Sequence, residues 1–220
     1  MLTVHHLNNS RSQRIIWLLE ELELDYQITS YQRDGTTNLA PAALEAIHQL
    51  GKSPVLTDSG DGTVAERMII ESGAIIDYVL RHYGRGRLMP ELGTEDFEQY
   101  LQWLHYAEGS AALPLMLTLY TSRLGAPKDD ASQALQSRIG DEMRRHLTYL
   151  DQALEGVDWY VGNRLSGADI QLSFVAEIAP LMYSATKLPN LAAFRKRCHS
   201  RPAYRRALDR GGVYAYGPRA

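Results

Sequence analysis

The sequence predicts an α/β N-terminal domain followed by an all-α C-terminal helical bundle. Strand and helix patterns alternate up to residue 84, and this alternation is typical of a sheet covered by helices. Residues 84–93 (GRGRLMPELG) contain glycines and a proline without a hydrophobic period, which indicates a linker. Beyond this segment only helical periodicity remains. We therefore expect one domain at 1–84, a linker at 85–93 and a second domain at 94–220.

The first elements are predicted in the order strand, helix, strand, helix. Leu2–Leu7 alternates apolar and polar residues, as a strand does. A helix follows, with one apolar face at the 3.6-residue period made of Ile15, Leu18, Leu19 and Leu22. Asp25–Tyr31 is predicted as a second strand, and Pro41–Leu50, which begins with proline, as a short helix. The strand–helix–strand order indicates a parallel pair.

A β-hairpin and a helix are predicted to complete this domain. Ser53–Asp58 and Thr63–Ile69 are strand-like segments on either side of the turn SGDG, whose glycines suit a tight connection. Glu71–Gly84 is predicted as a helix that ends at its glycine.

The second domain is predicted from helical stripes alone. A helix over 95–109 places Phe97, Tyr100, Leu101 and Leu104 on one face. A helix over 131–156 does the same with Ile139, Met143, Leu147, Leu150 and Leu154. Residues 169–185 are apolar nearly all round, which predicts a buried central helix. Short helices around 191–199 and 202–210 complete the predicted bundle.

Composition narrows the class of protein. The chain has 220 residues, 45% of them hydrophobic, and a formal charge of −3, which argues against a nucleic-acid or anionic-membrane surface. Neither a transmembrane segment nor a secretory signal is visible, so a cytoplasmic location is expected. The single cysteine, Cys198, excludes an internal disulfide and a CxxC redox pair. The seven histidines show no metal-binding spacing, so we expect no metal site.

Four local motifs carry a resemblance to a known family. They are NNSRSQR (8–14), GKSPVL (51–56), ESGAI (71–75) and LSGAD (165–169). In this order they resemble the cytosolic glutathione transferases, over the whole chain. The resemblance implies a thioredoxin-like glutathione-binding domain, a helical domain with the electrophile site and a homodimer. It also implies glutathione as a co-substrate, with no permanently bound cofactor. The formal charge of −3 is the reason to expect neither nucleic acid nor a membrane as a partner.

The resemblance assigns the cysteinyl part of glutathione to GKSPVL. In the family the proline before the third strand is cis, and the next residue offers its backbone to the tripeptide; Pro54 and Val55 match these positions. An extended peptide can then pair with Val55 like an added strand. The alternative is that Pro54 only begins an edge strand. Lys52 is a further candidate, for a ligand carboxylate.

The motif ESGAI is expected to hold the γ-glutamyl end. Helix N-termini carry unpaired N–H groups and bind carboxylates readily. By resemblance, Ser72 takes the carboxylate and Glu71 lies near the ammonium. Ser72 as a simple N-cap is the alternative, and both can hold together.

Ser10 has two interpretations. From the residues alone, Ser10 to Gln13 satisfies the S-x-x-Q pattern of a capping box. By resemblance, serine-type transferases place a catalytic hydroxyl about four residues before an arginine, as Ser10 precedes Arg14. The turn contains neither tyrosine nor cysteine, which argues against the other catalytic types. We predict a serine-type, bacterial-like member in which Ser10 donates to the thiolate, with Asn9 or Arg11 assisting. Ser12 is a competing donor, and Asn9 can also donate through its amide.

The helical domain supplies a structural motif and an apolar wall. Ser166 and Asp169 match the family's capping motif before the buried helix, a folding element. The expected electrophile site is lined by Tyr106, Leu113, Met116 and Tyr120, for which ordinary core or dimer packing is the alternative. The tyrosine-rich tail after residue 211 could cover this site.

The expected activity is conjugation of the glutathione thiolate to small hydrophobic electrophiles, as in detoxification. The first alternative activity is that of relatives in the family that use glutathione to reduce peroxides, to remove halogens or to isomerise their substrates. A non-catalytic binding protein on the same fold is the second. The sequence does not name the electrophile, the physiological role or the residues of the dimer interface.

Overall fold

The computed structural model describes residues 1–60, 66–127, 129–183 and 187–218. The chain separates into two compact units, Met1–Met89 together with Cys198–Ala220, and Pro90–Arg197. The first unit therefore differs from the domain expected at 1–84, because it includes the last segment of the chain. The second unit is an insertion between two parts of the first.

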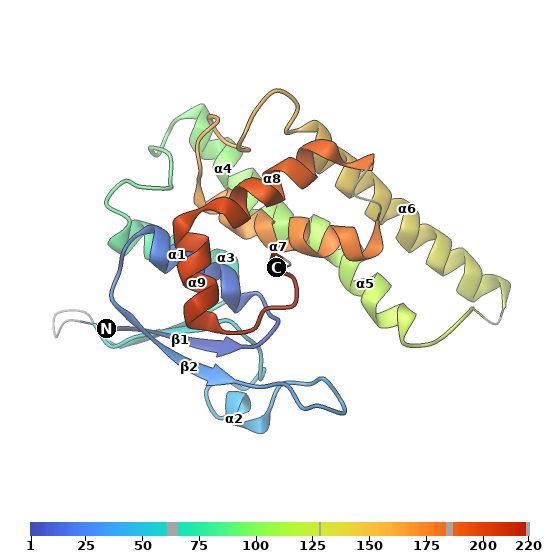
Figure 1. The fold of residues 1–220 in the computed structure, drawn as a ribbon, viewed down its shortest axis with the longest axis horizontal. Helices are drawn as coiled ribbons and strands as arrows, with labels where there is room; N and C mark the ends of the chain where they lie inside the picture. The colour runs from blue at the N-terminus through green and yellow to red at the C-terminus, as the bar shows by residue number, and fades with distance from the viewer. Residues whose placement is uncertain (61–65, 128, 184–186, 219–220) are drawn as a thin grey trace. The chain divides into compact units, whose positions relative to one another are not determined.

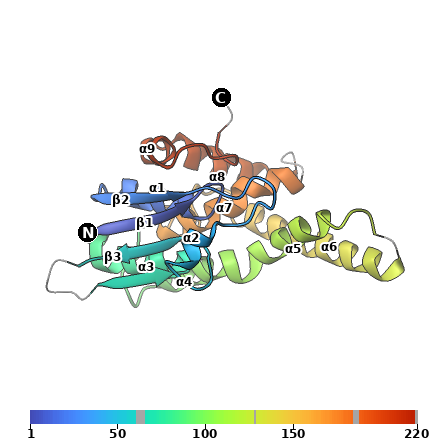
Figure 2. The same ribbon diagram turned by 90° about the horizontal axis from the view of Figure 1, so that it is seen from below.

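In the described part of the chain, four strands form one mixed sheet in the order β2-β1-β3-β4. Figure 2 shows β2, β1 and β3 side by side. β1 is parallel to β2 and antiparallel to β3, which is antiparallel to β4. The strands are Leu2–Leu7 (β1), Tyr26–Tyr31 (β2), Val55–Asp58 (β3) and Arg67–Ile70 (β4). Residues 63–65 of the predicted fourth strand, and 61–62 of the turn before it, lie outside the described residues.

Helix α1 (Ser12–Glu21) is the centre of the first unit. It contacts β1, α3 (Ser72–Tyr83) and α9 (Pro202–Gly211), and Figure 1 shows α9 alongside it. All of its residues from Ser12 to Glu20 are buried. The prediction of a single buried face was therefore wrong, because α9 covers the other side of the helix.

Helix α2 (Ala42–Glu45) is much shorter than the helix predicted over 41–50. The chain leaves the helix through turns, in which the N–H of Ile47 donates to Leu44 and that of Gly51 to His48. Gly51 has a φ of +55°, a left-handed conformation that ends the helical geometry. Leu44 is the one buried residue of this helix. Burial of side chains therefore contributes little free energy to a longer helix.

Charged pairs join α9 to α1. Arg206 Nε lies 2.7 Å from Glu20 Oε2 and Arg201 Nη2 lies 2.9 Å from Glu21 Oε2. Burial raises the pKa of Glu20, but hydrogen bonds from Arg206, Tyr26 and Arg210 outweigh it and leave the pKa below its usual value. These partly buried bonds fix the last helix on the first one.

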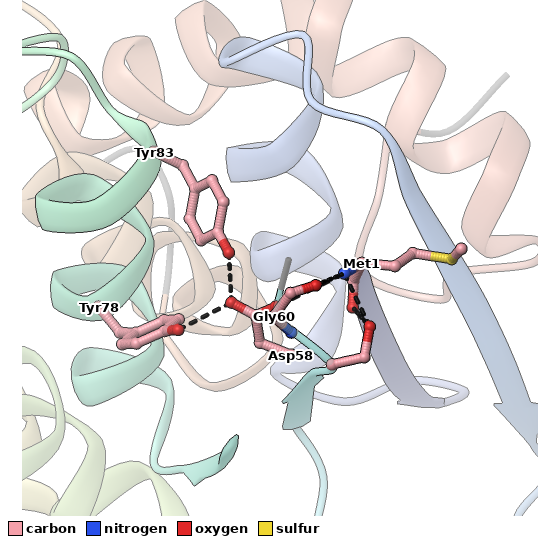
Figure 3. A network of polar contacts seen from close by, with 6 residues as sticks. Met1, Asp58, Gly60, Tyr78 and Tyr83 are labelled. Carbon is pink, nitrogen blue, oxygen red and sulfur yellow. Dashed lines mark hydrogen bonds and ion pairs between the residues drawn. The ribbon is translucent and has the colours of Figure 1, made fainter. Parts of the chain in front are cut away.

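The buried carboxylate of Asp58 joins β3 to α3. It accepts hydrogen bonds from the hydroxyls of Tyr78, at 2.8 Å, and Tyr83. Figure 3 shows these two tyrosines on one side and Met1 and Gly60 on the other. The Gly60 N–H donates at 2.9 Å, and the Met1 ammonium lies 3.6 Å away. Burial raises the pKa of Asp58, but these donors outweigh it, so the group stays ionised.

The second unit is helical throughout its described elements. They are α4 (Glu95–Tyr106), a π-helix (Ala107–Ala111), α5 (Ala112–Ser122), α6 (Asp130–Gln152), α7 (Gly167–Met182) and most of α8 (Pro189–Ser200). The helix predicted over 95–109 ends early, because the π-helix carries the chain into α5. Helix α6 ends at Gln152, before the end predicted at 156, and buries four residues of the predicted stripe: Ile139, Met143, Leu147 and Leu150. The fifth, Leu154, is buried just beyond the helix. Residues 184–185 of the predicted buried helix lie outside the described residues.

Helix α7 is buried from Gly167 to Ala179, which agrees with its apolar sequence. Within the described residues, no helix is both long enough and apolar enough to cross a membrane.

Candidate functional site

The turn between β1 and α1 places Ser10 just outside the helix. Helix α1 begins at Ser12, its N-cap is Arg11, and no side chain caps it. The capping box predicted for Ser10 and Gln13 was therefore wrong, because Ser10 lies one residue too early. Both amide atoms of Gln13 are buried without a hydrogen-bond partner among the described residues.

Ser10 instead belongs to a hydroxyl cluster, which we define as Ser10, Ser12, Ser53 and the ring of His6. Ser10 Oγ lies 2.8 Å from Ser12 Oγ and 3.5 Å from Ser53 Oγ. Ser12 Oγ lies 2.7 Å from His6 Nδ1. The Ser12 N–H also donates to Ser10 Oγ, at 3.2 Å. Ser10 is buried, with 5% of its surface exposed.

His6 was not among the predicted site residues. It is buried on β1, and its ring also hydrogen-bonds to the backbone of Gly211 at the end of α9. Burial lowers the pKa of His6, and the Gly211 bond opposes this only in part, so the ring is neutral near pH 7. A signal was present in the sequence, since Leu2, Val4 and His6 share one face of the strand. A polar residue in line with two buried apolar ones requires a polar partner.

The Ser53–Pro54 peptide bond is cis, at the start of β3. Ser53 Oγ donates to the His5 carbonyl at 2.9 Å and accepts from the Leu7 N–H at 3.2 Å. These bonds attach the loop before β3 to the end of β1, beside Ser10. Val55 is buried and pairs with His5 and Ile70, whereas Lys52 is exposed.

Glu71 and Ser72 form the start of α3. Glu71 is exposed and has a φ of +65°, a conformation that non-glycine residues seldom adopt. Ser72 is the first helical residue, so its interpretation as the N-cap was wrong: that position is Glu71. The buried Arg14 of α1 donates from Nη2 to Ser72 Oγ. The positive charge of Arg14 and the helix N-terminus both favour an anion at Ser72.

Asn9 and Arg11 flank Ser10 in the turn. Asn9 has a φ of +52°, and its side-chain oxygen accepts from the Ala215 N–H at 2.7 Å. The segment after α9 therefore contacts the turn that carries Ser10. Arg11 is partly exposed.

The residues predicted to line the electrophile site lie in the second unit. Leu113, Met116 and Tyr120 share a face of α5, with Leu113 and Tyr120 exposed. Tyr106, the last residue of α4, lies with its hydroxyl 2.6 Å from His146 Nδ1. Burial, with a contribution from Tyr149, raises the pKa of Tyr106, so its phenol stays protonated.

Ser166 and Asp169 form a capping box at the start of α7. The Asp169 carboxylate accepts from the Ser166 N–H at 2.8 Å, the Ser166 hydroxyl at 2.7 Å and the Tyr160 N–H at 2.9 Å. Burial raises the pKa of Asp169 to about 6, against the opposing effect of these donors.

The first unit thus connects three of the predicted motifs through side chains. Ser10 contacts the Ser53–Pro54 loop, and Arg14, one helical turn later, contacts Ser72. No group of three or more histidine, cysteine, aspartate or glutamate side chains suited to a metal ion occurs among the described residues.

Comparison with known proteins identifies the family. Residues 1–81 match the model of the glutathione S-transferase N-terminal domain, and residues 112–202 match that of the C-terminal domain. Glutathione S-transferase 1 of Saccharomyces cerevisiae is 33% identical over 190 residues, which cover 81% of each chain. The chain belongs to the glutathione S-transferase family. Glutathione S-transferase 3 of Schizosaccharomyces pombe is 30% identical over 96% of this chain and 88% of its own.

Solved structures agree with this assignment. A crystal structure of a glutathione S-transferase from Actinobacillus pleuropneumoniae has a TM-score of 0.86 and 31% identity, covering 98% of this chain and 95% of its own. A glutathione transferase from Phanerochaete chrysosporium, solved with oxidised glutathione, has a TM-score of 0.78 at 22% identity, covering 96% of this chain and 94% of its own. The second likeness shows the fold alone. Glutathione is the co-substrate of this family of transferases.

Proposed function

We propose that this chain transfers the glutathione thiolate to small hydrophobic electrophiles, with Ser10 as the catalytic hydroxyl. The observation that carries the proposal is the position of Ser10. Its Oγ lies 3.5 Å from Ser53 Oγ, before the cis Pro54, and Arg14, one helical turn later in the same unit, bonds to Ser72. A peptide that spans these two places would bring its central residue to the Ser10 hydroxyl.

Thiol activation is the chemical task. A free thiol has a pKa of about 8.5, so only a few per cent is ionised near pH 7. A hydrogen bond to a charged acceptor contributes about 1.5–3 kcal/mol, which corresponds to a thiol pKa lower by about one to two units. The N-terminus of α1 adds to this stabilisation. The serine-type assignment rests on this hydroxyl, since neither tyrosine nor cysteine occurs in the turn.

The tripeptide is proposed to lie along β3 and the start of α3. The backbone of Val55 pairs with the cysteinyl residue, and Ser72 with the helix N-terminus receives the γ-glutamyl carboxylate. Glu71 is proposed to pair with the γ-glutamyl ammonium group. Lys52 is proposed to pair with a second carboxylate of glutathione. Asn9 and Arg11 assist at the turn. The buried Arg14 supports this arrangement because it places a positive charge behind Ser72.

The electrophile is proposed to contact Tyr106, Leu113, Met116 and Tyr120. The exposure of Leu113 and Tyr120 supports this role, because neither side chain is used in the core of the second unit. We also propose a homodimer, as expected for the family. Peroxide reduction, dehalogenation or isomerisation through the same thiolate is the second candidate activity.

The test combines glutathione-affinity retention with a chlorodinitrobenzene assay. The wild type and Ser10→Ala are both expected to bind glutathione, and Ser10→Ala to lose about ten- to hundredfold in kcat/KM near pH 7. Ser30→Ala, at an exposed position on β2, is the control and should match the wild type.

Three results would change the proposal. Full turnover by Ser10→Ala at every pH removes Ser10 from the mechanism. A wild type that is not retained by glutathione overturns the proposed function. Retention without turnover on a broad panel of electrophiles favours a binding protein instead.

A further inference from the structure

Ser10 is the outer end of a buried hydrogen-bonded path that ends on an imidazole. The path runs from Ser10 Oγ to Ser12 Oγ over 2.8 Å and from Ser12 Oγ to His6 Nδ1 over 2.7 Å. All three residues are at most 5% exposed, so water has little access to the path. Both distances are short enough for a proton to pass from one heavy atom to the next.

The second contact of His6 sets the direction of the hydrogen bonds. The backbone of Gly211 favours the charged imidazole, which is the effect of a carbonyl oxygen that faces a ring N–H. Nδ1 faces Ser12, so Nε2 carries this hydrogen and the neutral ring leaves Nδ1 as an acceptor. Ser12 then donates to Nδ1 at 2.7 Å, which is closer than the Leu7 carbonyl at 3.3 Å. The Ser12 oxygen accepts from the Ser10 hydroxyl at 2.8 Å, which is closer to Ser10 than Ser53 Oγ is at 3.5 Å. The hydrogen of Ser10 therefore points inward, toward Ser12.

This arrangement has a consequence for Ser10 in the resting protein. With its hydrogen turned inward, Ser10 offers lone pairs outward, one of which already accepts from the Ser12 N–H. An oxygen in this state accepts a hydrogen bond from a thiol and does not donate one to a thiolate. For Ser10 to stabilise a thiolate, the hydrogens of the path must shift.

We propose that His6 is the proton acceptor for the glutathione thiol, which it reaches through Ser12 and Ser10. The inference rests on the proposed function and deepens it. The thiol proton passes to Ser10 Oγ, the former Ser10 proton to Ser12 Oγ, and the former Ser12 proton to His6 Nδ1. The products are a thiolate, two neutral hydroxyls and an imidazolium that keeps its bond to Gly211. Ser10 now donates to the thiolate, and the reverse shift returns the proton to the adduct or to water.

The surroundings of His6 suit this role. The charged residues of α1 each bond to another residue: Arg14 with Ser72, Glu20 with Arg206 and Arg210, and Glu21 with Arg201. His5, its neighbour on β1, bonds to Tyr31. Burial keeps His6 neutral before the thiol arrives, and the thiolate is the counter-charge that favours the imidazolium afterwards. His6 touches no substrate and is a positioning residue.

The main experiment measures the pKa of the glutathione thiol on the protein, from the ultraviolet absorption of the thiolate. The variants are His6→Gln, whose amide hydrogen-bonds but takes up no proton, and Ser12→Ala, which breaks the path with a small change in volume. Both are expected to raise the bound-thiol pKa by about one unit, since the thiol then ionises without an internal acceptor. His5→Gln, on the opposite face of the same strand, is the matched control and should leave this pKa unchanged.

The pH profile separates this role from a structural one. The kcat/KM of either variant should be about tenfold low near pH 6.5 and approach the wild-type value near pH 9, where the thiol ionises unaided. A loss that is equal at all pH values contradicts the proposal. The double variant should behave like either single one, because both lie on one path; additive effects also contradict it.

The outcomes distinguish the relay from the proposed function. If the wild type does not bind glutathione, or if Ser10→Ala leaves the bound-thiol pKa unchanged, the proposed function fails. If Ser10→Ala raises that pKa but His6→Gln and Ser12→Ala do not, Ser10 acts by hydrogen bonding alone and only the relay is overturned.

Discussion

Two helix starts in this chain share a serine-led pattern and behave differently. Ser166 precedes α7 in an extended conformation, with φ −134° and ψ 171°, and forms a capping box with Asp169. Ser10 precedes α1 with the same spacing to Gln13, yet the N-cap is Arg11 and no box forms. At α7 the backbone N–H and the hydroxyl of Ser166 both donate hydrogen bonds to the Asp169 carboxylate. At α1 the hydroxyl bonds to Ser12, which in turn bonds to His6.

The difference shows how tertiary contacts override a local pattern. Asp169 is an acceptor with three donors around it, so the capping geometry satisfies the whole group. Gln13 has no such set, and its amide is buried without partners among the described residues. A serine that is not needed as a cap is available for chemistry. Three predictions test this contrast, in order of expected size.

Replacement of Asp169 should have the largest effect on stability. Asp169→Ala leaves three donors without their acceptor in a buried site, and we expect the free energy of unfolding to fall by about 2–4 kcal/mol. Urea denaturation measures this. Asp129→Ala, at the exposed N-cap of α6, is the matched control with an expected loss of about 1 kcal/mol. Equal losses for the two variants would show that burial adds nothing to this cap.

Gln13→Met should be the opposite case. The change keeps the length of the side chain and removes two buried polar atoms that have no hydrogen-bond partner in the part of the chain that the structure describes, so we expect stability to rise by about 1 kcal/mol. Thermal and urea unfolding should agree on the sign. A loss of stability would mean that the Gln13 amide does contribute to the start of α1, as the sequence pattern suggested.

The smallest effect concerns His6 and pH. Its folded pKa lies below the unfolded value of about 6.5, so the unfolded chain binds more protons as the pH falls below that value. The wild type should therefore lose more stability than His6→Gln on acidification from about pH 6.5 to pH 5. The difference between their urea midpoints across this range measures it. If the two proteins lose equal stability over this pH range, protonation of His6 does not destabilise the folded protein, and the prediction is wrong.

Much of the fold follows from periodicity in the sequence. The stripe of Ile139, Met143, Leu147 and Leu150 predicted the buried face of α6, and the apolar run of α7 predicted a buried helix. The parallel β1–β2 pair followed from the strand–helix–strand order. Long apolar patterns are informative because burial dominates their free energy.

The remaining features depend on contacts between distant residues. The burial of α1 on all sides depends on α9, about 190 residues later, which no local pattern indicates. The role of His6 depends on Gly211 in the same way. The motifs GKSPVL and ESGAI indicated where Pro54 and Ser72 lie, whereas the link from Arg14 to Ser72 required coordinates. The functional roles of all the predicted site residues stay predictions: Asn9, Ser10, Arg11, Lys52, Val55, Glu71, Ser72, Tyr106 and the α5 residues.

The discontinuous first unit has a consequence for biosynthesis. On the ribosome, β1 and α1 emerge early, and α9 emerges only after the whole inserted unit has been made. Until then Trp17 lacks Tyr204, against which its ring packs edge-on, and Glu20 and Glu21 lack Arg206 and Arg201. A nascent chain or a product of a premature stop upstream of Arg201 would therefore expose the centre of the first unit to chaperones and proteases. Helix α9, which carries Gly211, is thus the last helix that the first unit gains during synthesis.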